Sequence, residues 1–248
     1  MTIIDTLHAN KDQMVVENLI AEFYKTYPGL TNLIDAGANR GFHFEKMTHL
    51  PDVQRCLAIE ANPEHIDKLK SLVIEGKSQV VDKALVGNNI DDEEVTFKIS
   101  KEYHGRGGVK GAHIWEIIQS DLKFAEVTVP TVKLDVLVEE NFPKKLDFMK
   151  MDLEGSELGI LLHSHKVYEK GCMIVMENSF HGPALNQISR EDWISFVESK
   201  GYFIVDFNFE PCVPKNLFHY NHAFLIPKGK YLKAKEFFLE CCKKLNLY

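Results

Sequence analysis

Short apolar runs alternate with amphipathic stretches along most of the chain, and this rhythm predicts βαβ units around a largely parallel sheet. Apolar runs predict strands at residues 32–36, 54–61, 78–87, 146–155 and 172–179. Amphipathic spacing predicts helices at residues 11–27, 42–49, 63–76, 156–165 and 190–201. Two further strands, at 202–209 and 222–228, and a terminal helix at 231–245 complete the predicted fold.

The rhythm changes between residues 93 and 132. Two stretches there alternate apolar and polar residues as half-buried strands do, on either side of a glycine-rich loop. We therefore expect an α/β fold with an inserted antiparallel ribbon and loop at 94–132. Neither a repeat nor a linker interrupts the pattern, so we expect a single domain over 1–248 with an N-terminal helical extension at 1–29. The loop at 103–112 has two readings, a lid over a site or a disordered segment.

Composition and charge narrow the possible partners. Of the 248 residues, 45% are hydrophobic, and 36 acidic residues outnumber 29 basic ones to give a net charge of -7. This balance argues against nucleic acid or an anionic membrane as partner. The five cysteines are odd in number and lack paired spacing, and the N-terminus lacks the basic segment of a signal peptide. We expect a cytoplasmic protein with reduced cysteines that acts on a small molecule.

The run Asp-Ala-Gly-Ala-Asn-Arg-Gly follows directly from the first predicted strand, at residues 35–41. It matches neither the phosphate loop of nucleoside triphosphatases nor the glycine fingerprint of dinucleotide-binding proteins. Asp35 would repel a pyrophosphate but suits a cation such as a ligand ammonium group. Gly37 and Gly41 would let the backbone approach that ligand closely.

The second and third predicted strands also end in acidic residues. Glu60, at the tip of the second strand, stands where doubly wound folds hold the two hydroxyls of a ribose; the alternative is a solvated strand-end glutamate. Asp82 can accept a hydrogen bond from an adenine amino group, and the backbone at Ala84 can pair with the ring. A ligand with an amino-acid end near Asp35 and a ribose near Glu60 has the shape of S-adenosylmethionine (SAM).

Three linked motifs, LIDAGANRGFH, AIEANPEHIDKL and VPTVKLDVLVEE…LDFMKMDLEGSELGIL, resemble the FkbM-type SAM-dependent methyltransferase family. The resemblance implies a Rossmann-like class I methyltransferase fold and, usually, methyl transfer to a hydroxyl oxygen. The stretch at 131–135 departs from it, because the family more often has Thr-Leu-Asp without the intervening residues. The cofactor-binding residues that the motifs imply are Asp35, Gly37, Ala38, Asn39, Gly41, Glu60, Ala61, Asp82 and Ala84.

Two charged residues interrupt the apolar strand at 146–155. Lys150 and Asp152 are two residues apart and so share one face of the strand, where a buried charge must be paired or line a cavity. In the usual strand order, the carboxyl ends of the first, fourth and fifth strands would bring Asp35, Asp152 and Glu177 together. We expect a methyl-transfer site there, although a structural ion pair would also explain the pattern.

The catalytic roles follow from chemistry. Asp152 or His181, in the loop after the fifth strand, would take the acceptor proton, and Lys150 would orient Asp152 or the acceptor. Glu154 and Glu157 begin a helix, where acids are favoured by the helix dipole alone, so a helix-end role competes with a catalytic one. Neither histidine nor cysteine spacing fits a metal site, and no metal is expected.

These observations predict a SAM-dependent methyltransferase that acts on a hydroxyl of a sugar or another small metabolite. Two other classes remain open. One is a SAM-binding or partner-binding module without catalysis. The other is an NAD-dependent oxidoreductase, which the glycine spacing disfavours.

Overall fold

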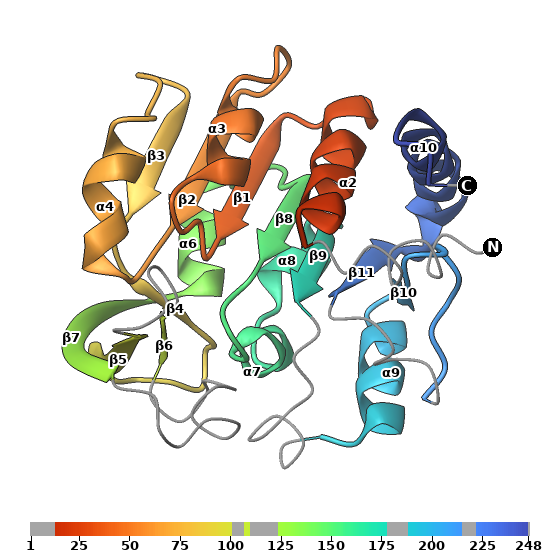
Figure 1. Cartoon of the computed structure of the whole chain (residues 1–248). Helices are drawn as coiled ribbons and strands as arrows, with labels where there is room; N and C mark the ends of the chain where they lie inside the picture. The colour runs from red at the N-terminus through yellow and green to blue at the C-terminus, as the bar shows by residue number, and fades with distance from the viewer. Residues whose placement is uncertain (1–12, 101–106, 110–123, 178–187, 215–221, 248) are drawn as a thin grey trace.

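The computed structural model describes residues 13–100, 107–109, 124–177, 188–214 and 222–247. Its main feature is a seven-stranded sheet in the order β10-β11-β9-β8-β1-β2-β3 (Figure 1). The strands are β1 (Asn32–Ala36), β2 (Arg55–Ile59), β3 (Ser78–Val81), β8 (Phe148–Met151), β9 (Met173–Glu177), β10 (Tyr202–Val205) and β11 (His222–Pro227). All neighbouring pairs are parallel except those that β11 forms with β9 and β10. The predicted, mostly parallel sheet is confirmed.

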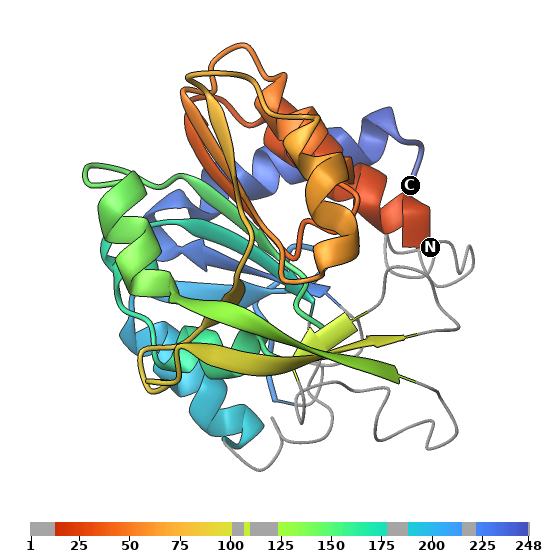
Figure 2. The same cartoon turned by 90° about the vertical axis from the view of Figure 1, so that its left-hand side faces the viewer.

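Helices cover both faces of this sheet (Figure 2). One apolar core packs beneath α2 (Gln13–Thr26), α3 (Phe42–Thr48), α4 (Pro63–Lys70) and α10 (Tyr231–Lys244). The other packs beneath α6 (Leu134–Asn141), α7 (Glu157–Leu162), α8 (Lys166–Glu169) and α9 (Arg190–Ser199), and the short 3₁₀ helix η2 (Lys228–Lys230) leads into α10. No helix within the described ranges is long and apolar enough to cross a membrane.

A second, four-stranded sheet lies beside the carboxyl ends of β2 and β3 (Figure 1). Its order is β4 (Ala84–Val86), β7 (Phe124–Lys133), β5 (Glu94–Ser100) and β6 (Gly107–Val109). The pairs β5–β7 and β5–β6 are antiparallel, so the predicted ribbon is confirmed. The remainder of the glycine-rich loop at 103–112, like His181, lies outside the described residues.

The single strand predicted over 78–87 is wrong. The chain leaves the main sheet after β3, turns at Asp82 and Lys83, and continues as β4, which pairs in parallel with β7. An apolar pattern indicates that a segment is buried but not which sheet it joins. The pattern over 78–87 therefore does not distinguish one strand from two short strands in different sheets.

The helix predicted over 63–76 is shorter in the structure and ends at Lys70. Serine hydroxyls compete for the backbone beyond that point. The Ser71 hydroxyl donates to the Lys68 carbonyl at 2.6 Å, and the Ile74 N–H donates to the Ser78 hydroxyl at 2.8 Å.

Helices α6 and α8 were not predicted, and one aspartate connects them. Asp135, in the first turn of α6, accepts hydrogen bonds from the backbone N–H groups of His165 and Lys166 at the start of α8, each at 2.9 Å. It also accepts from the Asn88 side chain at 2.7 Å. Asp135 therefore stabilises the packing of the two helices, and both of its carboxylate oxygens accept hydrogen bonds within the protein.

Candidate active site

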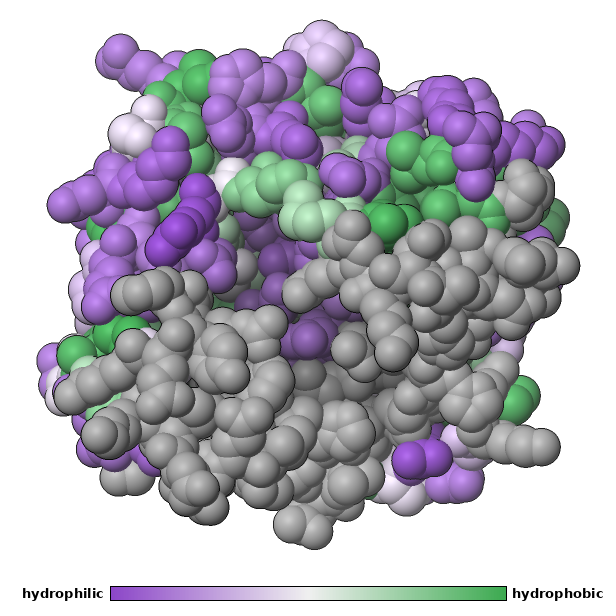
Figure 3. Space-filling model, viewed as in Figure 1, coloured by the Kyte–Doolittle hydropathy of each residue, from purple (hydrophilic) through white to green (hydrophobic). Residues whose placement is uncertain are grey.

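A cleft opens at the carboxyl ends of the parallel strands, between the two sheets. It encloses about 610 Å³, part of it open to solvent, and Figure 3 shows a hollow with hydrophilic walls near the centre of this face. Ligands of open α/β sheets bind at this edge. The lining residues are Gly37, Asn39, Ile59, Glu60, Ala61, Lys83, Ala84, Leu85, Phe97, Asp152, Leu153, Glu154 and Ser156.

The glycines of the loop after β1 are needed for contacts within the protein. Gly37 has φ of +74°, and a Cβ there would lie 1.8 Å from the carbonyl oxygen of Asp152. Gly41 has φ of +89°, and its Cβ would lie 2.5 Å from the Leu72 side chain. The predicted approach to a ligand applies to Gly37, which lines the cleft, whereas Gly41 is not among the lining residues described.

Glu60 connects the loops that follow β1 and β2. Its carboxylate accepts hydrogen bonds from the N–H groups of Asn39 and Asn62, both at 2.7 Å, and only 7% of the residue is exposed. Burial raises the pKa of Glu60, although these hydrogen bonds act in the opposite direction. Glu60 also lines the cleft. The structure therefore gives it a structural task at the position where sequence reasoning placed a ribose.

The remaining predicted cofactor residues fall into two groups. Ala61 and Ala84 line the cleft, as Glu60 does. Ala38 and Asp82 are not among the described lining residues, and the Asp82 carboxylate lies 3.3 Å from the Lys70 ammonium at the surface. Sequence reasoning missed Lys83 and Phe97, which line the cleft. Phe97 belongs to the inserted ribbon, whose position against the main sheet no sequence pattern indicates.

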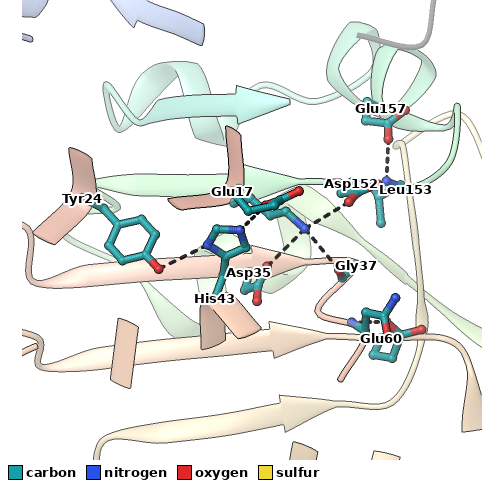
Figure 4. A network of polar contacts seen from close by, with 11 residues as sticks. Glu17, Tyr24, Asp35, Gly37, His43, Glu60, Asp152, Leu153 and Glu157 are labelled. Atoms are coloured by element: carbon teal, nitrogen blue, oxygen red, sulfur yellow. Dashed lines mark hydrogen bonds and ion pairs between the residues drawn. The ribbon is translucent and has the colours of Figure 1, made fainter. Parts of the chain in front are cut away.

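Lys150 forms the centre of a buried charge network. Its Nζ lies 3.4 Å from Asp152 Oδ2, 3.8 Å from Asp35 Oδ1 and 3.4 Å from the carbonyl oxygen of Gly37 (Figure 4). Lys150 is 5% exposed. Burial opposes its charge, but the neighbouring carboxylates outweigh that effect and raise the pKa of Lys150. Lys150 is therefore an ammonium ion at neutral pH and cannot serve as the base.

Asp35 does not reach the cleft. It is 1% exposed and is not among the described lining residues, and the cation that it faces is Lys150. Sequence reasoning placed a ligand ammonium there; the strand register puts Asp35 directly beside the Lys150 ammonium on β8.

Three carboxylates meet at the ends of β8 and β9. Asp152, Glu157 and Glu177 each offer an oxygen within 4.8 Å of the others. Of the three residues predicted to converge at this edge, Asp152 and Glu177 belong to this cluster, whereas Asp35 lies 3.8 Å from Lys150. Asp152 and Glu177 share a hydrogen bond. Burial opposes ionisation of Asp152, but the charge of Lys150 lowers its pKa, while burial and the neighbouring carboxylates raise the pKa of Glu177. The shared proton therefore belongs to Glu177, and Asp152 is ionised.

Glu157 stabilises the turn between β8 and α7. Its carboxylate accepts hydrogen bonds from the backbone N–H groups of Leu153 and of Gly155, the latter at 3.0 Å. Glu154, in the same turn, has φ of +53° and lines the cleft. Burial raises the pKa of Glu157 to about 8. These contacts favour the structural interpretation of Glu157.

The carboxylates of Asp152, Glu157 and Glu177 are spaced as ligands of a cation would be. A proton on Glu177 would reduce the repulsion between these carboxylates without a cation. An acidic cluster alone therefore does not define a metal site. The absence of a metal requirement thus remains a prediction.

A second layer of polar residues lies behind Lys150 and was not predicted. His43 Nε2, from α3, lies 2.5 Å from the Glu17 carboxylate of α2, and His43 Nδ1 lies 3.2 Å from the Tyr24 hydroxyl (Figure 4). His43 and Tyr24 are 4% and 1% exposed. The sequence shows α2 only as an amphipathic helix, so it gave no sign of this contact.

Comparison with known proteins gives one family match. The model of a family described as the methyltransferase FkbM domain matches residues 35–204, which is more than half of the chain. No curated protein sequence matches the chain.

Several solved structures match the chain at low similarity. Precorrin-6y C5,15-methyltransferase from Geobacter metallireducens is 13% identical, with a TM-score of 0.38 over 84% of this chain and 85% of that one. A TehB-like SAM-dependent methyltransferase from Corynebacterium glutamicum is 12% identical, with a TM-score of 0.39 over 89% and 98%. The plantazolicin methyltransferase BpumL in complex with S-adenosylhomocysteine (SAH) is 13% identical, with a TM-score of 0.41 over 90% and 88%. Similarity at this level carries no argument about substrate.

Proposed function

Because the chain belongs to the methyltransferase FkbM domain family, we propose that it transfers the methyl group of SAM to a hydroxyl oxygen of a sugar or another small metabolite. Family membership makes the chain a SAM-dependent methyltransferase with a Rossmann-like class I fold. The hydroxyl oxygen and the small acceptor are the proposal. The observation that carries it is the Asp152 carboxylate in the cleft wall, 3.4 Å from the ammonium of the buried Lys150.

The chemistry of the cleft wall suits SAM. Ile59, Leu85 and Phe97 provide apolar wall for a purine, and the Glu60 oxygens retain lone pairs for ribose hydroxyls. Asp152 and Glu154 place negative charge in the same cleft, which suits a ligand that carries cationic groups. When bound, SAM supplies a methyl group already activated by its sulfonium charge.

The protein then has to position the acceptor and remove its proton. Asp152 lines the cleft, so its ionised carboxylate can accept a hydrogen bond from an acceptor hydroxyl. Asp152 would take up the hydroxyl proton as the acceptor oxygen gains the methyl group that SAM would supply. The Lys150 ammonium, with its Nζ 3.4 Å from Asp152 Oδ2, holds this carboxylate in position. Holding the groups in line is the larger part of the catalytic effect in such a displacement.

The acidic cleft also favours a class of acceptor. Asp152 and Glu154 line it, and the whole chain has a net charge of -7. Carboxylates accept hydrogen bonds from sugar hydroxyls but repel phosphates, so nucleic acids and sugar phosphates are poor candidates. All five cysteines are unpaired and buried, which supports the proposed cytoplasmic location.

The test is to incubate the protein with SAM and pools of sugars, polyols, amines and thiols. SAH is quantified and methylated products are identified by mass spectrometry. We expect SAH to accumulate with a hydroxylated acceptor and an O-methyl product to appear. Methylation of nitrogen or sulfur would contradict the hydroxyl proposal. Binding of SAM without turnover in any pool would favour the alternative, a binding module without catalysis.

A further inference from the structure

Three carboxyl groups act on the buried Lys150. One buried ammonium group faces the carboxylates of Asp35 and Asp152, and a third carboxylate, Glu17, acts on it from α2. Glu17 precedes the matched residues 35–204, so it lies outside the family domain. Figure 4 shows Glu17 and His43 together with Asp35 near the centre of the network. Glu17 therefore adds a further acidic group to this buried region from outside the family domain.

Glu17 is held as an anion by its neighbours. Its side chain is 12% exposed and lies 2.5 Å from His43 Nε2, while the Tyr24 hydroxyl contacts the other ring nitrogen of His43. Burial opposes ionisation of Glu17, but the hydrogen bond to His43 and the charge of Lys150 outweigh it and keep the pKa of Glu17 below its ordinary value. Its negative charge is consequently fixed in place and poorly screened.

A fixed charge behind the cleft distinguishes ligands that differ in charge. SAM carries a cationic sulfonium, whereas its product SAH carries a neutral thioether and is otherwise nearly the same molecule. Glu17 acts on Lys150, and Lys150 pairs at 3.4 Å with Asp152, which lines the cleft. An anion at Glu17 thus lowers the free energy of the cationic ligand relative to the neutral one.

We propose that Glu17, held by His43 and Tyr24, is a specificity-determining residue that makes the cleft prefer the sulfonium of SAM over the thioether of SAH. The inference rests on the proposed function, since it assumes that SAM occupies this cleft. It gives the segment before the family domain a role in cofactor selection and in release of the spent cofactor.

The test is calorimetric titration of the native protein, of Glu17→Gln and of Glu17→Asp with SAM and with SAH. Glu17→Gln keeps an acceptor for His43 but removes the charge. A charge at a distance on the order of 10 Å, in a medium of intermediate dielectric constant, changes the ratio of the two affinities by roughly three- to fifteenfold. We expect the preference for SAM over SAH to fall by that factor in Glu17→Gln, with SAH affinity nearly unchanged, and to persist in Glu17→Asp.

The matched control is Glu22→Gln. Glu22 lies on the same helix but pairs with Lys25 and Lys244, away from the network, so its loss should leave the ratio unchanged. If both ligands bind Glu17→Gln with the native ratio, or are weakened equally, Glu17 has no role in specificity and the inference is overturned. If the native protein binds neither ligand, the proposed function fails together with it.

Discussion

The carbonyl oxygen of Asp152 occupies the space in which a Cβ atom of residue 37 would lie, at 1.8 Å from that position. The contact joins the ends of β1 and β8, the two strands that carry Asp35 and Lys150. Because the obstructing atom belongs to the backbone, it cannot move aside without shifting the turn that carries the proposed base.

Gly37→Ala should therefore be strongly destabilising. The positive φ contributes roughly 1–3 kcal/mol, and the overlap adds a further ~1–3 kcal/mol. Gly76→Ala is the matched control, because Gly76 has the same φ of +74° but has nothing within 4 Å of its Cβ position. Urea unfolding of both variants separates the two contributions. Equal losses of stability would mean that the contact with Asp152 is unimportant.

Glu60→Ala should weaken SAM binding by about 1–3 kcal/mol, the usual loss when a buried polar group is left unpaired. The structure adds a second expectation that sequence reasoning did not make. Since the N–H groups of Asn39 and Asn62 lose their acceptor, the melting temperature should fall as well. Glu64→Ala, at an exposed site on α4, serves as the control. Unchanged SAM affinity in calorimetry, with a lower melting temperature, would assign Glu60 a structural role only.

Asp152→Asn should reduce turnover by roughly 10²–10⁴-fold, the range for loss of a general acid–base group. Affinity for SAH, which lacks the sulfonium charge, should change far less, because the other cofactor contacts proposed lie on the first strands of the sheet. Steady-state kinetics and calorimetry on one preparation measure both quantities. Native turnover in Asp152→Asn would transfer the role of base to another residue, and His181→Ala would be the next variant to examine.

Lys150→Met should destabilise the fold by about 3–5 kcal/mol, because it leaves Asp35 buried without its cation. Adding Asp35→Asn removes the orphaned charge and should restore much of that stability without restoring turnover. Recovery of turnover in the double variant would show that Lys150 acts only as a structural ion-pair partner. Chemical denaturation and the methyl-transfer assay together decide between these roles.

The pKa of about 8 for Glu157 predicts a dependence of stability on pH. Between the unfolded value near 4.5 and about 8, the folded protein holds a proton that the unfolded chain has lost, so stability falls as pH rises through this window. The slope from one group is at most about 1.4 kcal/mol per pH unit. Glu157→Gln resembles the protonated form and should flatten the profile, whereas Glu75→Gln, at an exposed site, should not. A profile that Glu157→Gln leaves unchanged would contradict the raised pKa.

The cysteines should be inert in the folded protein. All five are buried, and burial raises the pKa of Cys212 and of Cys242 to about 12, so neither thiol forms the reactive thiolate at neutral pH. Alkylation at pH 7.5 should be slow in buffer and complete in denaturant, as mass spectrometry can follow. Rapid labelling of either residue under native conditions would refute its burial.

Most of the main sheet could be predicted from the sequence, because its strands are short and apolar and are separated by helices of clear amphipathic spacing. β1, β2, β8 and β9 lie where they were predicted, and the fixed strand order brought Lys150 and Asp152 to the expected edge. The division of 78–87 between two sheets could not be predicted, because both halves are apolar and only the tertiary pairing of β4 with β7 separates them.

The site was predicted less completely, for a related reason. Sequence analysis assigned Asp35 to a ligand because it could not identify Lys150 as the neighbour of Asp35 across the sheet. The two residues are 115 positions apart in the sequence, and side-chain pairing at that separation leaves no local pattern. Glu17 and His43 are joined by a contact between two helices, which neither helix reveals alone. The motifs therefore predict where the cleft lies, whereas the contacts of each residue depend on tertiary packing.

The four-stranded sheet has a small apolar core of its own, built on Ala84, Phe97, Ile99 and Val129. Through Ala84 and Phe97 it supplies one wall of the cleft, while the opposite wall belongs to the seven-stranded sheet. Substitutions in this wall can alter what the cleft admits while the strands that carry Lys150 and Asp152 stay unchanged. Leu85 and Phe97 of the proposed purine wall thus belong to one sheet and Lys150 to the other.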